Sequence, residues 1–107
     1  MPGSLQLTSQ SLRGRTVVRA VGEVDMVTCD DLVAAVAQGM EETGRVELDL
    51  SGITFMDASG VHALLACSES AAAQHWDFWL GSTSEAVLRV LSATETRQLF
   101  RVLPRAV

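Results

Sequence analysis

The residues best suited to chemistry stand in one short stretch, Asp57-Ala58-Ser59-Gly60. A strand pattern precedes it and a helix pattern follows it, so Ser59 is expected at the start of a helix. A hydroxyl there commonly accepts a hydrogen bond from a free backbone N–H, and this capping role alone accounts for Ser59. A phosphoserine at the same position would meet unpaired N–H groups and the positive end of the helix dipole. Ser59 is therefore a candidate phosphorylation site and a candidate helix cap.

The surroundings of Ser59 are predicted to be acidic and open to a protein partner. Glu23 and Asp25 follow the second predicted strand, and with Asp57 they are expected at the same end of the sheet. Gly60 removes a side chain beside the hydroxyl, which would let another protein approach the backbone closely. Adding about two negative charges here would change the surface potential sharply, so phosphorylation would weaken docking without refolding.

Catalysis by Ser59 lacks the partners it would need. His62 stands one turn into the same predicted helix, and His75 stands near its far end. A serine hydrolase usually carries Gly-x-Ser-x-Gly, and Met56–Gly60 lacks the first glycine. We expect no enzyme activity and no catalytic residue. His62 is expected on the helix surface or against a docking partner, and His75 can favour the helix dipole.

No cofactor or metal site is predicted. Cys29 and Cys67 have no CxxC spacing and no histidine arranged beside them, so two reduced thiols are expected. A redox-sensitive disulfide between them remains an alternative. For a nucleotide, only Ser51-Gly52 and Ser59-Gly60 are available, without a glycine-rich loop.

The elements that must position Ser59 alternate between extended and helical patterns, which is typical of an α/β domain. Strands are predicted at Leu5–Gln10, Arg15–Gly22, Val46–Leu50 and Trp76–Leu80, with a hairpin turn at Ser11–Gly14 and a connection at Ser51–Met56. In the third strand Glu47 and Asp49 alternate with apolar residues, so helices should cover mainly one face of the sheet. We expect a mixed sheet of about four or five strands.

Two helices are predicted between these strands, and a third helix and a short last one are predicted after them. Thr28 with Asp31 forms a capping box, Gly44 ends that helix, and Ser82 with Glu85 forms a second box. The central helix runs from Ser59 to Gln74, and the last begins at Thr94. The predicted core positions are Leu32, Val33, Val36, Ala37, Met40, Val61, Leu64, Leu65, Ser68, Ala71, Ala72, Val87, Leu88 and Leu91. Trp76 and Trp79 are expected on opposite faces of one strand.

Composition narrows the classes of function. The chain has 107 residues, of which 48% are hydrophobic and 20% charged, so residues 1–107 are expected to form one globular domain. The net charge of −5 and the lack of a basic cluster argue against nucleic acid as a partner. No apolar run approaches the roughly 20 residues of a membrane span, and no signal peptide is visible. A cytoplasmic location and no direct membrane insertion are expected.

Three motifs in order carry a family resemblance. Asp57-Ala58-Ser59-Gly60 after Leu-Asp-Leu-Ser-Gly resembles the phosphorylation motif of STAS domains, the family shared by sulfate transporters and anti-sigma factor antagonists. Gly22-Glu23-Val24-Asp25 is similar to the family's turn into the first helix. Val87–Leu91 followed by Leu99-Phe100 resembles its closing helix and tail. The resemblance covers nearly the whole chain and implies a single STAS domain.

The resemblance also implies a function. Ser59 would be the residue that an anti-sigma factor with serine kinase activity phosphorylates. The unphosphorylated chain would bind that anti-sigma factor and release a sigma factor, and phosphorylation would end the binding. Asp57 would be the acidic residue beside the acceptor, with Glu23 and Asp25 in the docking loop. An alternative is a constitutive STAS subunit of a transporter or signalling complex, in which Ser59 is only a cap. A weak homodimer is left open.

Overall fold

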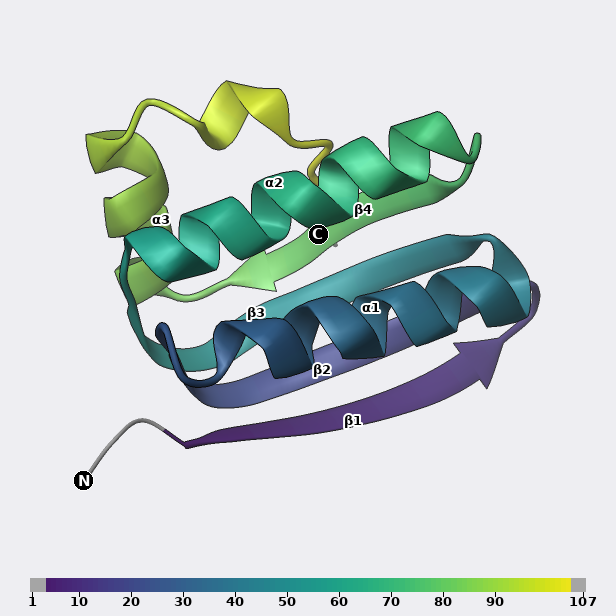
Figure 1. Cartoon of the computed structure of the whole chain (residues 1–107), viewed down its shortest axis with the longest axis horizontal. Helices are drawn as coiled ribbons and strands as arrows, with labels where there is room; N and C mark the ends of the chain where they lie inside the picture. The colour runs from purple at the N-terminus through teal and green to yellow at the C-terminus, as the bar shows by residue number, and fades with distance from the viewer. Residues whose placement is uncertain (1–3, 105–107) are drawn as a thin grey trace.

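A four-stranded sheet and three helices form two layers (Figure 1). The computed structural model describes residues 4–104. The elements are β1 (Leu5–Leu12), β2 (Arg15–Val24), α1 (Cys29–Thr43), β3 (Arg45–Met56), α2 (Ala58–Ala73), β4 (Asp77–Thr83), α3 (Glu85–Ala93) and the 3-10 turn η1 (Arg97–Leu99). This is a single α/β domain, as the alternating patterns predicted.

The strands stand in sequence order, β1-β2-β3-β4. β1 and β2 form the predicted antiparallel hairpin, whose turn is allowed by positive φ angles of 48° at Arg13 and 81° at Gly14. β2, β3 and β4 are parallel neighbours. Parallel strands need a crossover, and α1 and α2 provide the two crossovers. Because β2 and β3 are parallel, their carboxyl ends meet at the same end of the sheet.

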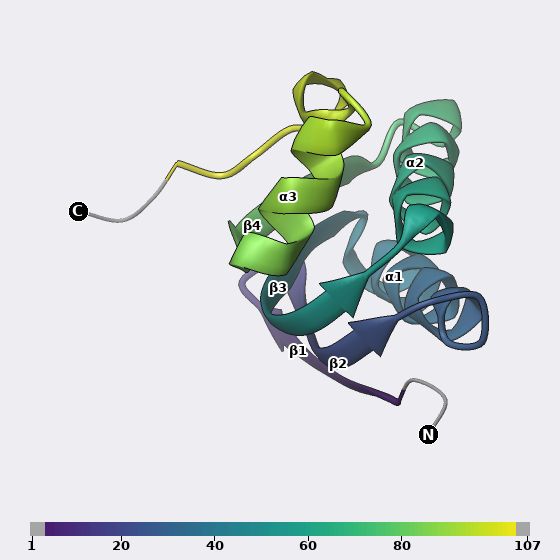
Figure 2. The ribbon, with the colours of Figure 1, turned by 90° about the vertical axis from the view of Figure 1, so that its left-hand side faces the viewer.

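The helices cover one face of the sheet, as the alternation in β3 predicted (Figure 2). Val46, Leu48 and Leu50 are fully buried under the helices. Val18, Ala20 and Val24 of β2 are fully buried as well. Hydrophobic burial against α1, α2 and α3 is therefore the main force that fixes this layer on the sheet.

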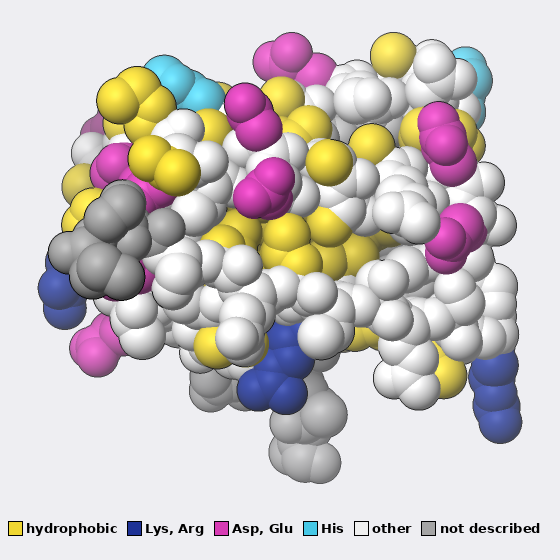
Figure 3. Space-filling model, turned by 60° about the horizontal axis from the view of Figure 1, so that its bottom comes forward, with side chains coloured by type: hydrophobic (Ala, Val, Ile, Leu, Met, Phe, Trp, Pro, Cys, Tyr) yellow, Lys and Arg dark blue, Asp and Glu magenta, His cyan; other side chains and the backbone are white. Residues whose placement is uncertain are grey.

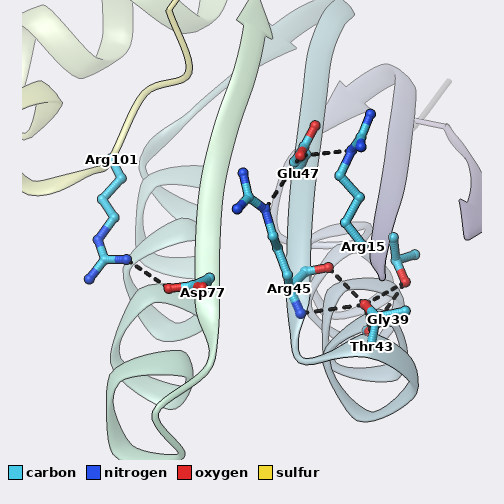
Figure 4. Close-up of polar contacts among 8 residues, drawn as sticks. Arg15, Gly39, Thr43, Arg45, Glu47, Asp77 and Arg101 are labelled. Atoms are coloured by element: carbon cyan, nitrogen blue, oxygen red, sulfur yellow. Dashed lines mark hydrogen bonds and ion pairs between the residues drawn. The ribbon is translucent and has the colours of Figure 1, made fainter. Parts of the chain in front are cut away.

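The opposite face of the sheet is polar and carries its own contacts (Figure 4). The Glu47 carboxylate lies 2.9 Å from Arg15 Nε and 3.5 Å from Arg45 Nε. The guanidinium groups of Arg45 and Arg101 lie 5.6 and 5.7 Å from the centre of the Trp79 ring. Trp79 thus belongs to the open face. The expectation that Trp76 and Trp79 lie on opposite faces of one strand fails, because Trp76 precedes β4.

Several predicted boundaries and core positions are wrong. β3 continues to Met56, so Ser51–Met56 is strand rather than connection. The short helix expected from Thr94 is only the 3-10 turn Arg97–Leu99. Ala37 and Ala72 are exposed, because each lies at the border of its helix's apolar stripe and not at its centre.

The third helix is capped two residues later than predicted. Ser84, not Ser82, stands at the N-cap, and its hydroxyl accepts a hydrogen bond of 3.2 Å from the Val87 amide. Ser82 belongs to β4, which runs on to Thr83. Thr28 does stand at the N-cap of α1, but its side chain makes no capping bond. The predicted box of Thr28 and Asp31 is therefore absent. Gly44 ends α1 as predicted, with a φ of 73°.

Candidate functional site

The candidate site lies where β2 and β3 end and the helices α1 and α2 begin. The Asp57 amide donates a hydrogen bond of 3.3 Å to the Val24 carbonyl. This bond joins the two strand-to-helix junctions, and it places the loop before α1 beside the start of α2. The expectation that Glu23, Asp25 and Asp57 share one end of the sheet is thereby met.

Asp57, rather than Ser59, caps α2. Its carboxylate accepts a hydrogen bond of 2.9 Å from the Ser59 amide. The Asp57 carbonyl accepts bonds from the Gly60 and Val61 amides at 3.0 and 3.4 Å. The prediction that Ser59 is the cap is wrong because a better acceptor stands two residues before it. A carboxylate at the positive end of the helix dipole is also favourable.

The Ser59 side chain takes no part in capping α2. The residue is half-buried on the second position of α2, and within residues 4–104 its hydroxyl makes no hydrogen bond. The first-turn amides of Ser59, Gly60 and Val61 already have acceptors, so the expectation of unpaired N–H groups awaiting a phosphate fails for these three. A phosphate on Ser59 would instead stand beside the Asp57 carboxylate and add to its negative charge.

Gly60 lies inside the molecule and not on its surface. A Cβ at this position would clash with the Met56 side chain and come within 3.1 Å of Val24 Cγ1. The absence of a side chain therefore lets α2 pack against the ends of β2 and β3. Gly60 does not open the backbone to a partner, contrary to the sequence expectation, because the core occupies the space beside it.

The loop between β2 and α1 is held by Asp25 and Thr28. The Asp25 carboxylate accepts hydrogen bonds from the amides of Val27 and Thr28 at 2.9 and 3.0 Å. The Thr28 hydroxyl donates to the Glu23 carbonyl at 2.8 Å and accepts from the Asp25 amide at 3.0 Å. Thr28 is buried, and these bonds explain why its hydroxyl does not cap α1. Asp25 thus shapes the loop that carries the exposed residues.

An exposed apolar group at this end of the sheet was missed by sequence reasoning. Met26 is 79% exposed, Val27 68% and Phe55 47%. Met26 and Val27 stand in the loop that Asp25 holds, and Phe55 pairs with Glu23 across β3 and β2. The signal was available, since two large apolar residues between Asp25 and Thr28 fit neither a strand nor a helix pattern. We call Met26, Val27 and Phe55 the apolar rim.

His62 and Ser59 lie on the same side of α2. They are three residues apart, which on a helix places them on one face, and His62 is exposed as predicted. Glu23 is half-buried near the end of β2. His75 lies outside this region, beyond the end of α2, with a positive φ of 59°. The structure therefore brings together Ser59, Asp57, His62, Glu23 and Asp25, but not His75.

The two cysteines have different environments. Both are free thiols; Cys29 is half-buried at the start of α1, and Cys67 is buried in α2. Burial raises the pKa of Cys67 from 9.0 to about 12. Among residues 4–104, no group of three or more His, Cys, Asp or Glu side chains is placed to hold a metal ion. In the same part of the chain no helix is both long and apolar enough to cross a membrane.

Comparison with known proteins agrees with the observed fold. The sequence model of the STAS domain family matches residues 6–105. An anti-sigma factor antagonist from Mycobacterium paratuberculosis is 25% identical, with a TM-score of 0.82 over 95% of this chain and 87% of that one. The anti-sigma factor antagonist SpoIIAA in its unphosphorylated form is 17% identical, with a TM-score of 0.73 over 94% and 90%.

A further solved structure is that of the Bacillus cell fate determinant SpoIIAA in its phosphorylated form. It is 19% identical, with a TM-score of 0.65 over 95% of this chain and 93% of that one. At this level of identity the two SpoIIAA structures show the fold alone. The fold predicted from the three sequence motifs is confirmed.

Proposed function

The chain belongs to the STAS domain family, and we propose that it is an anti-sigma factor antagonist controlled by phosphorylation of Ser59. In this proposal the unphosphorylated chain binds an anti-sigma factor that is a serine kinase, in the cytoplasm, and so releases a sigma factor. Phosphorylation of Ser59 by that kinase ends the binding. The chain is a regulatory binding domain in this scheme, without catalysis or a cofactor of its own.

One observation carries the proposal, namely that among the described residues the Ser59 hydroxyl makes no hydrogen bond that stabilises the fold. Asp57 already caps α2, so the hydroxyl is left without a hydrogen bond within residues 4–104. A modification at this oxygen would break no internal bond. The fold would then be the same in both states, and the switch would act on the surface alone.

The apolar rim supports docking at the same place. Met26 and Val27 are mostly exposed, although large apolar side chains are stabilised by burial. The Asp57–Val24 hydrogen bond holds their loop next to the start of α2. A protein interface usually has apolar residues at its centre and polar residues around them. The apolar rim would form the centre of such an interface, and Ser59 would lie in the polar part. His62, exposed on the Ser59 side of α2, would extend this surface.

The electrostatics give the direction of the switch. The chain carries a net charge of −5, and Glu23, Asp25 and Asp57 stand at this end of the sheet. A partner that docks here must tolerate an acidic surface. A phosphate on Ser59 would place about two more negative charges beside Asp57, and like charges across an interface cost several kcal/mol. Binding is therefore expected to be lost without unfolding.

The test is intact-mass spectrometry with site mapping after incubation with ATP and each candidate anti-sigma kinase from the same genome. We expect one added phosphate, located on Ser59 and absent from Ser59→Ala. Ser70→Ala is the matched control, since Ser70 is an exposed serine on the same helix. This control should be phosphorylated like the unmodified chain.

Binding measurements complete the test. Ser59→Ala should bind the kinase as tightly as the unmodified chain, and Ser59→Asp should bind more weakly. Stable binding by Ser59→Ala and Ser59→Asp alike, with no phosphate transfer from any candidate, would contradict the switch. That result would favour the constitutive-subunit function, in which the same fold serves as a permanent part of a transporter or signalling complex.

A further inference from the structure

The two edge strands of the sheet, β1 and β4, differ in whether another segment covers them. At the β4 edge, the Leu80 amide donates to the Arg101 carbonyl and the Leu103 amide donates to the Leu80 carbonyl, both at 2.8 Å. A bridge between Leu80 and Val102 completes this parallel contact. The segment Arg101–Leu103 thus covers the middle of the β4 edge, at Leu80. Within residues 4–104, β1 pairs only with β2, and its outer edge is uncovered.

β1 has none of the devices that usually protect an edge strand. Such strands are blunted by charges, by proline, by bulges or by shortness. β1 has eight residues, LQLTSQSL, without a charged residue or a proline. Its register with β2 is unbroken from Leu5 to Leu12. Figure 3 shows this absence of charge on the lower side of the molecule, where a largely uncharged band separates acidic side chains above from basic ones below.

The free backbone groups of this edge can be assigned. In an antiparallel pair, residues alternate between bonding the neighbour and pointing away from it. The Glu23 amide donates to the Ser4 carbonyl at 2.9 Å, which identifies the even-numbered residues of β1 as the ones that bond β2. The odd-numbered residues therefore direct their N–H and C=O groups outward. These are Leu5, Leu7, Ser9 and Ser11.

We propose that β1 pairs antiparallel with β1 of a second copy of this chain, forming one continuous eight-stranded sheet with Thr8 on the two-fold axis. In this register Leu7 pairs with Ser9 of the second copy and Leu5 pairs with Ser11. All four outward-pointing residues of each strand then exchange backbone hydrogen bonds. The register also keeps the helices of both copies on the same side of the sheet.

A second copy fits this edge because β1 has no charged residue that would repel the β1 strand of that copy. A chain with a net charge of −5 repels its own copy at long range. β1 carries no charge, so antiparallel self-pairing sets no like charges directly opposite each other. Ser59 itself stands apart from β1, since it lies on α2, which packs on α1, α3, β3 and β4.

Sedimentation equilibrium of the full chain, from micromolar to millimolar concentration, tests the proposal. We expect a reversible monomer–dimer equilibrium. Thr8→Lys sets two lysines opposite each other on the axis and should raise the dissociation constant of the dimer about tenfold or more. Ser9→Pro removes an outward N–H and should do the same. Ser70→Lys adds the same charge on an exposed position of α2 and should leave the dimer unchanged.

A mixing experiment tests the register. Thr8→Lys and Thr8→Glu should each dimerise more weakly than the unmodified chain when alone. When combined they should form a tighter mixed dimer, because opposite charges then meet at the axis. Circular dichroism of each variant establishes that it is folded. A chain that stays monomeric at millimolar concentration overturns the proposal, and so does a dimer that Thr8→Lys and Ser9→Pro leave intact. Neither result bears on phosphorylation of Ser59.

Discussion

At the scale of single residues, Asp57 caps α2, whereas the sequence had made Ser59 a candidate for both the cap and the phosphorylation site. Asp57 accepts the Ser59 amide at 2.9 Å and so caps α2, while the Ser59 hydroxyl stays without an internal bond among the described residues. A residue that both capped the helix and accepted phosphate would alter the helix end whenever the switch operated. With the two roles on separate residues, phosphorylation of Ser59 would leave the capping bond of α2 intact.

The division predicts unequal costs for two alanine substitutions. Asp57→Ala removes the cap and should lower the free energy of unfolding by about 1 kcal/mol. Ser59→Ala removes an unbonded hydroxyl and should lower it by less than about 0.5 kcal/mol. Urea unfolding followed by circular dichroism measures both. Asp57→Asn keeps a capping oxygen and should stay near the unmodified chain; a larger loss for Ser59→Ala than for Asp57→Ala would refute the assignment.

The buried thiol of Cys67 predicts an alkaline pH dependence. Its pKa is raised to about 12 in the folded chain, against 9.0 when solvated. Between these values the unfolded chain releases the proton and the folded chain retains it, so stability falls as pH rises above about 9. The sequence has no lysine and no tyrosine, so few other groups titrate there. Cys67→Ala should flatten this decline relative to the unmodified chain, measured by urea unfolding at several pH values.

At the scale of elements, the close approach of α2 to the ends of β2 and β3 depends on Gly60. A methyl group there would meet Met56 and Val24. Gly60→Ala should therefore lower the free energy of unfolding by about 1–3 kcal/mol, the usual cost of overpacking a core. Gly81→Ala is the control, since the nearest atom to its Cβ would be the Leu48 carbonyl oxygen at 3.4 Å. Equal stabilities of the two variants in thermal unfolding would contradict this.

The sequence predicts elements better than it predicts their ends. The alternation of Val46, Leu48 and Leu50 placed β3 and the face that the helices cover. The end of β3 was missed because Ser51 and Gly52 interrupt the alternation, where the pairing with β2 shifts register. Local patterns do not record such shifts, since they depend on the neighbouring strand.

The predictions of the helix-capping residues were also wrong because of tertiary contacts that local sequence patterns do not record. Several residues that can cap stand together at each helix start, and only the tertiary contacts choose among them. Thr28 was diverted to the Glu23 carbonyl, at 2.8 Å, and Ser84 took the place of Ser82 because β4 runs to Thr83. The apolar rim was missed because the periodicities of strands and helices do not apply to Met26 and Val27, which stand in a loop.

At the scale of the whole molecule, the two proposed surfaces lie on different elements. The Ser59 surface is formed where β2 and β3 end, and the pairing edge is formed by β1. Phosphomimetic Ser59→Asp should therefore leave the monomer–dimer equilibrium unchanged while it weakens binding to the anti-sigma factor. Sedimentation equilibrium of Ser59→Asp beside the unmodified chain measures this, and a change of tenfold or more would show that the two surfaces are coupled.

The covered β4 edge limits how many copies can join through the edges of their sheets. A monomer with one reactive end can only form a pair, whereas a monomer with two grows into a chain of unlimited length. Arg101–Leu103 occupies the second end, so the molecule is monofunctional. A variant that stops at Phe100 would be bifunctional, and light scattering should show growth past two copies with rising concentration. The last residues of the fold thus act as a chain terminator.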